Sequence, residues 1–390
     1  MNILFLYRTY PSFGGVEVVT TVLADRFVED GHEVTIVSFE GGRPDAAAHL
    51  HPSVAVRRLK FPLVSTANVA RLHGILAERN IDIIVNQWGL PFTVTWLCRK
   101  AMAGTRCRLI SVLHGAPDTS KVILVAEGKV REARFARPFY RMMLKLKEEV
   151  VRWSIRYIVR RSDRYVLLSD RSVGPLVDYA RLHDTTSLRV INNPLTVTTE
   201  EFDMAAKKKQ ILYVGRMDYE NKRVDRIVDI WERLAPLYPD WELVLVGDGP
   251  YKTVLLERIA KAGIPKVRFE AFRTEPPVAF YKEASLFLLA SDLEGWGLVL
   301  VESMSYGVVP VVYGSYEAVH DIIDDGVSGF VVPKPYSCEA MTGRIRRLMD
   351  DGGLRARMAS AAISAASRFD LGSIAARWYG LFDEINVRVL

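Results

Sequence analysis

The chain has 390 residues and a mass of 44.0 kDa; 49% of its residues are hydrophobic and 25% are charged, with a net charge of +6. This composition is globular, is long enough for two domains, and excludes a disordered chain. The three cysteines form no C-x-x-C pair, so neither a disulfide framework nor a zinc site is indicated, and a reducing cytoplasm fits best. No apolar run approaches the roughly 18 residues of a transmembrane helix, and the opening MNILFLYRTY predicts a β-strand rather than a secretory leader.

The charge is unevenly distributed along the chain. Residues 1–195 contain 28 lysines and arginines against 18 aspartates and glutamates, whereas acidic residues predominate in the remainder. A basic half can attract nucleic acid, an anionic membrane or an anionic small substrate, and charge alone does not choose among them.

Short β-rich runs alternate with helical stretches in both halves of the chain. The runs are NILFLY, EVTIVSF, IDIIVNQ, RLISVLHG, RYVLLSD and LRVINNP, followed in the second half by QILYVG, WELVLVGDG, VRFEAF, LFLLAS and VVPVVYG. Such alternation predicts an α/β fold with two doubly wound parallel sheets. The apolar periodicity is interrupted between Asn193 and Lys209, which is where we expect the domain boundary. Ligands of such sheets bind at the carboxyl ends of the strands, so we expect a central cleft there.

The first strand leads into the turn YRTYPSFGGVEVV, with Gly14 and Gly15 before a helix that carries Glu17 in its first turn. Paired glycines let a backbone approach a ligand closely and direct free N–H groups at an anion. A tight turn without a ligand explains the same pattern about as well. The absence of a G-x-G-x-x-G motif disfavours a dinucleotide site.

The histidine of SVLHGAPD, His114, stands at the end of a predicted buried strand and precedes a glycine. A lone histidine is often structural, but this placement is typical of an imidazole that faces a substrate. His32, His51, His73 and His183 lack such a placement.

Residues 121–164 hold 13 lysines and arginines against five acidic residues. A helical stripe is predicted within this segment, formed by Phe139, Met143, Leu146, Val150, Trp153 and Tyr157. Two interpretations stay open: an amphipathic helix packed on the sheet, or a surface that lies against anionic lipid. The residues proposed for a membrane or acceptor surface are Arg131, Arg134, Phe135, Arg137, Phe139 and Arg141.

In LYVGRMDYENKRVDRIV a strand ends at Gly215, Arg216 follows it, and Lys222 precedes a helix. An arginine fork and a lysine point charge near a helix N-terminus make a strong pyrophosphate clamp. A solvated charged loop describes Arg223 and Arg226 better.

The stretch LEGWGLVLVE places Glu294 on a predicted loop and Glu302 on the second turn of the following helix. The backbone of Gly295, Trp296 and Gly297 can present N–H groups to a phosphate where the helix begins, at Leu298. Two carboxylates here suit a nucleotide sugar, because each can accept hydrogen bonds from vicinal hydroxyls. An N-terminal helix charge and an exposed helical glutamate would explain the pattern without a ligand.

The chain contains five short motifs: EGWGLVLVE, VGRMDYENK, VGDGP, the GG-V-E turn and the HG pair at His114. Taken together, they resemble the motifs of the retaining GT-B glycosyltransferases of family 4. Each motif alone is unspecific, but the five occur in the family's order over most of the chain.

The resemblance implies two Rossmann-like domains: residues 1–193 for the acceptor and residues 194–370 for the donor, with a C-terminal helix, 371–390, packed on the first domain. It implies transfer of a hexose or N-acetylhexosamine from a nucleotide sugar, with UDP preferred, to a lipid-linked or glycan acceptor in surface polysaccharide or glycoconjugate biosynthesis. Anomeric configuration would be retained, and no cofactor or metal would be required. The expected location is cytoplasmic, peripheral to the membrane if the basic helix binds anionic lipid.

Carried over to this sequence, the resemblance implies that Glu294 binds the donor hexose, that Glu302 binds the ribose, and that His114 faces the reacting sugar. The resemblance assigns the donor phosphates and their surroundings to Arg216, Lys222, Gly14, Gly15, Gly295, Trp296, Gly297 and Leu298. Two departures put donor identity in doubt: Trp296 replaces the usual phenylalanine, and Ala271 stands where glycine is frequent.

Two other classes of protein would also use such a phosphate clamp: a sugar-nucleotide epimerase or hydrolase of the same fold, and a non-catalytic sugar-nucleotide-binding protein. The paired glutamates disfavour the first, and the complete set of clamp residues disfavours the second. A dehydrogenase would need a full glycine fingerprint. Nucleic acid is disfavoured because no recognised binding module is present.

Overall fold

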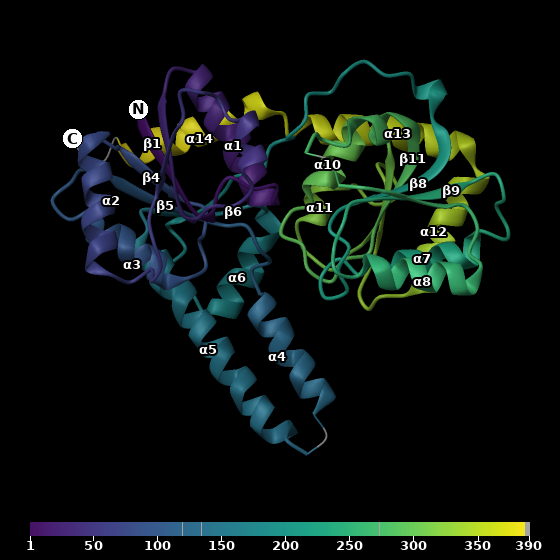
Figure 1. The fold of residues 1–390 in the computed structure, drawn as a ribbon, viewed down its shortest axis with the longest axis horizontal. Coiled ribbons are helices and arrows are strands. Elements are labelled where there is room, and N and C mark those ends of the chain that lie inside the picture. Colours follow the sequence, from purple (N-terminus) through teal and green to yellow (C-terminus); the bar gives the residue numbers. More distant parts are fainter. Residues whose placement is uncertain (119, 134, 273, 387–390) are drawn as a thin grey trace. The chain divides into compact units, whose positions relative to one another are not determined.

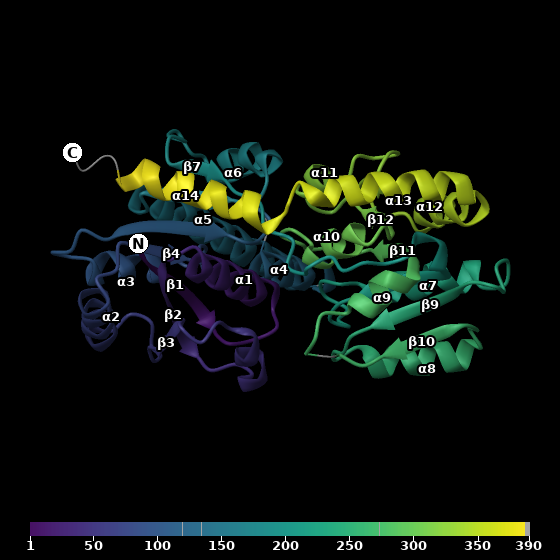
Figure 2. The ribbon, with the colours of Figure 1, turned by 90° about the horizontal axis from the view of Figure 1, so that it is seen from above.

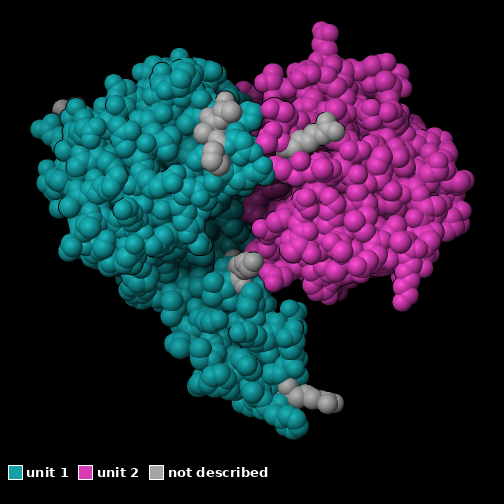
Figure 3. Space-filling view, viewed as in Figure 1, with its two compact units in different colours: residues 1–194, 371–390 teal, residues 195–370 magenta. Residues whose placement is uncertain are grey.

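The computed structural model describes residues 1–118, 120–133, 135–272 and 274–386. The chain divides into two compact units, which Figure 3 shows in different colours. Unit 1 comprises residues 1–194 and 371–390, and unit 2 comprises residues 195–370. The chain therefore passes from one unit to the other twice.

Unit 1 contains a seven-stranded parallel sheet with the order β3-β2-β1-β4-β5-β6-β7. Its strands are buried on both faces where apolar residues run without alternation, as in β4 and β6. The strands are β1 (Asn2–Thr9), β2 (Glu33–Glu40), β3 (Ala55–Arg58), β4 (Ile83–Asn86), β5 (Arg108–Leu113), β6 (Arg164–Leu167) and β7 (Leu188–Val190).

Helices cover both faces of this sheet (Figure 1). The helices of unit 1 are α1 (Gly15–Glu29), α2 (Thr66–Glu78), α3 (Phe92–Ala101), α4 (Lys121–Glu132), α5 (Arg137–Arg161), α6 (Val173–Ala180) and α14 (Leu371–Asn386), with short 3₁₀ turns at Pro44–His49 and Asp170–Ser172. Within the described part of the chain, no helix has the length and apolar character needed to cross a bilayer.

Helices α4 and α5 pack side by side as a hairpin that extends away from the sheet of unit 1 (Figure 1). The buried residues of α5 lie in its C-terminal part: Ser154, Ile155, Ile158 and Val159. None of these four residues belongs to the predicted stripe. The stripe itself is not buried: Phe139, Leu146, Val150 and Trp153 are 46–57% exposed, and Met143 and Tyr157 are half-buried.

The C-terminal helix α14 belongs to unit 1 and lies along it (Figure 2). Its apolar face is buried, with Trp378 4% and Phe382 0% exposed. The carboxylate of Glu384 pairs with Arg164, whose Nη2 lies 2.6 Å from Oε1, and with Arg189, whose Nε lies 2.9 Å from Oε2. Apolar packing and a partly exposed group of ion pairs thus attach the end of the chain to the first unit.

Unit 2 contains a six-stranded parallel sheet with the order β10-β9-β8-β11-β12-β13. Its strands are β8 (Lys208–Val214), β9 (Glu242–Val246), β10 (Val267–Glu270), β11 (Ala284–Leu289), β12 (Val309–Tyr313) and β13 (Phe330–Val332). Its helices are α7 (Val224–Leu234), α8 (Lys252–Ala262), α9 (Val278–Glu283), α10 (Leu298–Ser305), α11 (Val319–Ile322), α12 (Cys338–Asp350) and α13 (Gly352–Ser367), with a 3₁₀ turn at Met204–Ala206.

The six strands of unit 2 follow the same order as the first six strands of unit 1. In each sheet, the second and third strands are added on one side of the first strand, and the later strands are added on its other side. This is the doubly wound order. The reversal lies between β1 and β4 in unit 1 and between β8 and β11 in unit 2. Ligands of such sheets bind at the carboxyl ends of the strands flanking the reversal.

Candidate active site

The loops that follow β8 and β11 meet at the strand-order reversal of unit 2. The backbone N–H of Asp292 donates to the carbonyl of Asn221 over 2.7 Å, which joins the two loops directly. The first loop carries Arg216 and Lys222, and the second carries Glu294. Arg216, Lys222 and Glu294 therefore lie on adjacent loops of one unit, whereas Gly14, Gly15 and His114 belong to unit 1.

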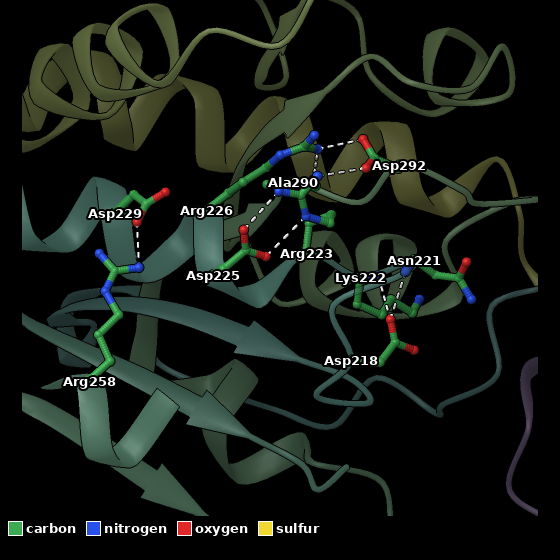
Figure 4. A network of polar contacts seen from close by, with 10 residues as sticks. All are labelled: Asp218, Asn221, Lys222, Arg223, Asp225, Arg226, Asp229, Arg258, Ala290 and Asp292. Atoms are coloured by element: carbon green, nitrogen blue, oxygen red, sulfur yellow. Dashed lines mark hydrogen bonds and ion pairs between the residues drawn. The ribbon is translucent and has the colours of Figure 1, made fainter. Parts of the chain in front are cut away.

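Asp218, which the sequence analysis did not single out, organises the first loop (Figure 4). Its Oδ1 accepts hydrogen bonds of 2.8 Å from the backbone N–H groups of Asn221 and Lys222, and its Oδ2 pairs with Arg216, with Nη2 at 2.5 Å. Burial acts to raise the pKa of Asp218, but these hydrogen bonds and the guanidinium outweigh it, so the pKa lies below its ordinary value. Asp218 is thus a charged anchor for both cations of the predicted clamp.

Lys222 and Glu294 form an ion pair between the two loops, with Nζ 2.6 Å from Oε1. The side chain of Lys222 is 24% exposed and that of Glu294 9%. An ion pair with one nearly buried partner fixes both side chains before any ligand arrives. A diphosphate would compete with Glu294 for the ammonium and would free the carboxylate to accept hydrogen bonds from sugar hydroxyls.

The expectation of a solvated loop at Arg223 and Arg226 is wrong. Arg226 is 9% exposed; its Nη1 donates to the Ala290 carbonyl over 2.9 Å and pairs with Asp292 Oδ1 over 2.6 Å. Arg223 also pairs with Asp292, over 3.0 Å, and its guanidinium lies 4.7 Å from the ring centroid of Tyr219. Both arginines face inward because Asp292 gives them a shared partner, which sequence spacing alone does not show (Figure 4).

The Gly295-Trp296-Gly297 turn leads into α10, which begins at Leu298. Gly297 has a φ of +91°, and a Cβ there would lie 2.9 Å from the hydroxyl of Tyr316, so a side chain would be strained and crowded. Trp296 is 3% exposed and meets the ring of Phe369 edge-on, with centroids 5.1 Å apart. The N–H groups of Leu300 and Val301 donate to the Gly297 carbonyl, so the first two N–H groups of α10, those of Leu298 and Val299, are the ones left to receive an anion.

Glu302 lies on α10 and is 7% exposed. Its Oε1 accepts a short hydrogen bond from Thr196 Oγ1, and its Oε2 accepts one of 2.7 Å from Tyr281 Oη. Burial raises its pKa, while these two hydrogen bonds act to lower it. Ribose binding by Glu302 stays a prediction, and a ribose hydroxyl would have to share an oxygen with Thr196 or Tyr281.

In unit 1, Gly14 and Gly15 form the turn between β1 and α1, with Gly15 as the first residue of the helix. A Cβ at Gly14 would lie 2.3 Å from Glu17 Oε2, so this carboxylate occupies the space that a side chain would need. Burial raises the pKa of Glu17, which is 8% exposed. The turn is therefore already filled by its own helix, while ligand binding by its glycines stays a prediction.

His114 follows β5 directly, and Gln87 follows the neighbouring β4. The imidazole Nε2 lies 2.5 Å from Gln87 Oε1. Burial lowers the pKa of His114 to about 4, so the ring is neutral at pH 7. Gln87 was missed because glutamine has no pKa or metal chemistry that marks it in a sequence, although its place at a strand end could have indicated it.

The residues proposed for a membrane or acceptor surface lie on the α4–α5 hairpin. Those that the structure describes are exposed: Arg131, Phe135, Arg137, Phe139 and Arg141. Arg134 lies outside the described residues. In the described ranges, no group of three or more His, Cys, Asp or Glu side chains is arranged to hold a metal ion.

Solved structures share this fold. HepE from Anabaena, crystallised in complex with UDP, superposes with a TM-score of 0.75 over 98% of this chain and 100% of its own, at 20% sequence identity. The chain therefore has a GT-B fold, with two Rossmann-like parallel-sheet domains.

Two sequence families together match most of the chain. Residues 13–198 match Glycosyltransferase Family 4, and residues 198–365 match Glycosyl transferases group 1. The chain belongs to these family 4 glycosyltransferases and is a glycosyltransferase.

Curated relatives are similar at low identity. The N-acetyl-alpha-D-glucosaminyl L-malate synthase of Bacillus anthracis is 22% identical over 83% of this chain and 81% of its own. The GalNAc-alpha-(1->4)-GalNAc-alpha-(1->3)-diNAcBac-PP-undecaprenol alpha-1,4-N-acetyl-D-galactosaminyltransferase of Campylobacter jejuni is 24% identical over 99% of both chains.

Proposed function

We propose that this enzyme transfers a hexose or N-acetylhexosamine from a UDP-sugar to a lipid-linked or glycan acceptor, with retention of anomeric configuration and without a metal. The observation that carries this proposal is the pair of loops in which Asp218 anchors Arg216 and Lys222 next to Glu294. The UDP bound to HepE and the undecaprenol in the name of the Campylobacter relative support the donor and acceptor classes.

The chemical step needs stabilisation of the diphosphate as it leaves. Negative charge develops on its oxygens, and cations and N–H groups that are already oriented stabilise that charge without reorganising. Arg216, Lys222 and the N-terminus of α10 supply such groups. Once the diphosphate has replaced Glu294 as the partner of the Lys222 ammonium, the Glu294 carboxylate would hold the hexose by accepting hydrogen bonds from its hydroxyls. Transfer from an alpha-linked UDP-sugar to give an alpha product retains the configuration, and the names of both curated relatives include alpha linkages.

The α4–α5 hairpin supports a peripheral position at an anionic membrane. Its exposed apolar side chains recur along α5 at helical spacing and continue onto its connection with α4. They are Phe135 (97% exposed), Phe139 (55%), Met142 (60%), Leu146 (57%), Val150 (53%) and Trp153 (46%). The surrounding residues carry most of the basic excess of the first half. Exposed apolar side chains beside lysines and arginines are typical of helices that lie on anionic bilayers, which would bring the enzyme to a lipid-linked acceptor.

The donor is tested by calorimetry and thermal shift with UDP, GDP, ADP, their hexose and N-acetylhexosamine conjugates, and NAD. A ligand at one hundred times its dissociation constant stabilises a fold by about 2.7 kcal/mol, which is readily measured. We expect a selective response to UDP and to one UDP-sugar. A response to NAD alone, or to no nucleotide, would contradict the proposal.

The membrane position is tested by sedimentation with phosphatidylglycerol vesicles. The double variant F139S/L146S and the triple variant R137Q/R141Q/K145Q should each bind fewer vesicles than the wild type, and binding should fall with added salt. The matched control is L237S/V254S, which removes apolar side chains of similar exposure, 60% and 46%, from unit 2. Equal sedimentation of all these proteins would remove the membrane role and leave the transfer reaction standing.

A further inference from the structure

Gln87 and His114 are neighbours because β4 and β5 run parallel and end at the same edge of the sheet of unit 1. Gln87 is the first residue after β4, and His114 is the first after β5. Their side chains meet with 2.5 Å between Gln87 Oε1 and His114 Nε2. A hydrogen bond joins them.

Three hydrogen bonds constrain the backbone of residues 87–89. Gln87 N–H donates to the Leu6 carbonyl of β1 over 2.9 Å, and Trp88 N–H donates to the Asn86 side chain over 3.0 Å. Gly89 N–H donates to the Val112 carbonyl of β5 over 3.2 Å, at a point where a Cβ would lie 2.1 Å from that carbonyl oxygen. Gln87 itself is 2% exposed. The amide is therefore presented to the imidazole by a backbone with little freedom.

The hydrogen bond selects one form of the histidine ring. The Gln87 oxygen can only accept, so His114 must donate from Nε2–H. Since the buried ring is neutral, its second nitrogen, Nδ1, carries a lone pair and no proton. Nδ1 is buried and has no hydrogen-bond partner among the residues that the structure describes, and the same holds for the Gln87 amide nitrogen.

We propose that Gln87 is a positioning residue that holds His114 in the Nε2–H form, so that Nδ1 accepts a hydrogen bond from a sugar hydroxyl during transfer. The role toward a sugar rests on the proposed function. A hydroxyl fits this nitrogen because it donates a proton, whereas a phosphate oxygen brings another lone pair and would be repelled. The orphaned amide nitrogen of Gln87 is a second donor beside the ring, suited to an oxygen of the same class of ligand.

The ring form can be measured without any substrate. Nitrogen-15 NMR of histidine-labelled protein, with His114 assigned by H114N, should show a neutral ring protonated at Nε2 throughout pH 6–8. The isosteric variant Q87M removes the acceptor and should shift the ring toward a mixture of both neutral forms. In Q87E, the carboxylate should stabilise the imidazolium, so the ring should titrate at higher pH than in the wild type. A wild-type ring protonated at Nδ1 would overturn the proposal.

The kinetic consequence is tested with a second buried glutamine as the matched control. Gln210 is 3% exposed, lies in unit 2 and donates to Glu242. We expect Q87M to lower kcat by about 10- to 100-fold and to leave UDP affinity unchanged. The range is taken by analogy from metal sites, where removing the hydrogen-bond partner that orients a ligating imidazole has an effect of this size. Q210M should retain near wild-type kcat, and thermal unfolding of both variants shows whether they fold.

The two proposals fail in distinguishable ways. If Q87M reduced kcat no more than Q210M, the positioning role would be wrong while the glycosyltransferase function stood. If the wild type transferred no sugar, the function would fail, and the NMR measurement would still decide whether Gln87 sets the form of His114.

Discussion

Asp218 illustrates how one residue can prepare a site for a charge that has not yet arrived. Its two oxygens serve different partners: one fixes the backbone that carries Lys222, and the other fixes the guanidinium of Arg216. Two cations close together would repel each other and lose orientation without a carboxylate between them. The negative charge of Asp218 lets the loop hold both cations ready for a diphosphate.

Replacing Asp218 should therefore weaken nucleotide binding indirectly, because Asp218 is proposed to act on the two cations and not on the nucleotide itself. For D218A we expect a loss of about 1.5–3 kcal/mol in UDP affinity, the range for hydrogen bonds to charged groups. D218N should lose less, because its Oδ1 can still accept from the backbone of Lys222. Calorimetry measures both. R258A is the control, since Arg258 forms an exposed pair with Asp229 on another part of unit 2 (Figure 4). Equal affinities in D218A and R258A would contradict the anchoring role.

The Lys222–Glu294 pair predicts different consequences for its two members. K222A removes a phosphate partner and leaves a nearly buried carboxylate unpaired, so nucleotide binding and transfer should weaken by about 2–5 kcal/mol. R216A should also lower affinity, by less, because Arg216 is 59% exposed. E294Q should reduce kcat more than UDP affinity, because its proposed partner is the sugar. Steady-state kinetics and calorimetry together test this split, and equal losses in E294Q would make Glu294 structural only.

At the scale of elements, α14 is attached to unit 1 through Glu384. The guanidinium of Arg189, together with that of Arg164, lowers the pKa of this carboxyl to about 2. A carboxylate with a lowered pKa in the folded state contributes stability that is fully present above its ordinary pKa and is lost as pH falls toward the folded value. The contribution of Glu384 should thus disappear between about pH 5 and pH 2.

E384Q tests this attachment. We expect the free energy of unfolding to fall by about 1.5–3 kcal/mol at pH 7, toward the lower end because Glu384 is 33% exposed. Denaturant unfolding at several pH values should show the difference between wild type and variant shrinking as pH falls through this window. A difference that is constant with pH would mean that the ion pair contributes nothing specific.

The elements themselves were largely predictable, since alternating apolar runs and helical stretches indicated two parallel sheets and the strand-end loops indicated Arg216, Lys222 and Glu294. The inward orientation of Arg223 and Arg226 was not predictable, because it depends on Asp292, which is distant in sequence and adjacent in the fold. Whether the α5 stripe is covered or exposed was left open for a related reason. Helical periodicity shows that a face is apolar, but not whether another element covers it.

At the scale of the whole molecule, the two units differ in charge and in proposed task. Basic residues predominate in the first half, which supplies most of unit 1, whereas the loops proposed to bind the donor, those after β8 and β11, lie in unit 2. Hydrogen exchange measured with and without UDP should locate the response. We expect the strongest added protection in residues 215–224 and 291–301 of unit 2, and little in β2 or α2 of unit 1. Stronger protection in unit 1 would contradict donor binding at the loops after β8 and β11.

The return of α14 to the first unit bears on the order in which the protein can form during synthesis. Unit 2 is a single continuous segment, so all of its residues are synthesised before the last helix. Unit 1 must wait for residues 371–386, whose Trp378 and Phe382 complete its core. Although it begins the chain, unit 1 is therefore finished last. A released chain that ends before residue 371 would contain every residue of unit 2, whereas its unit 1 would lack α14 and expose apolar core surface.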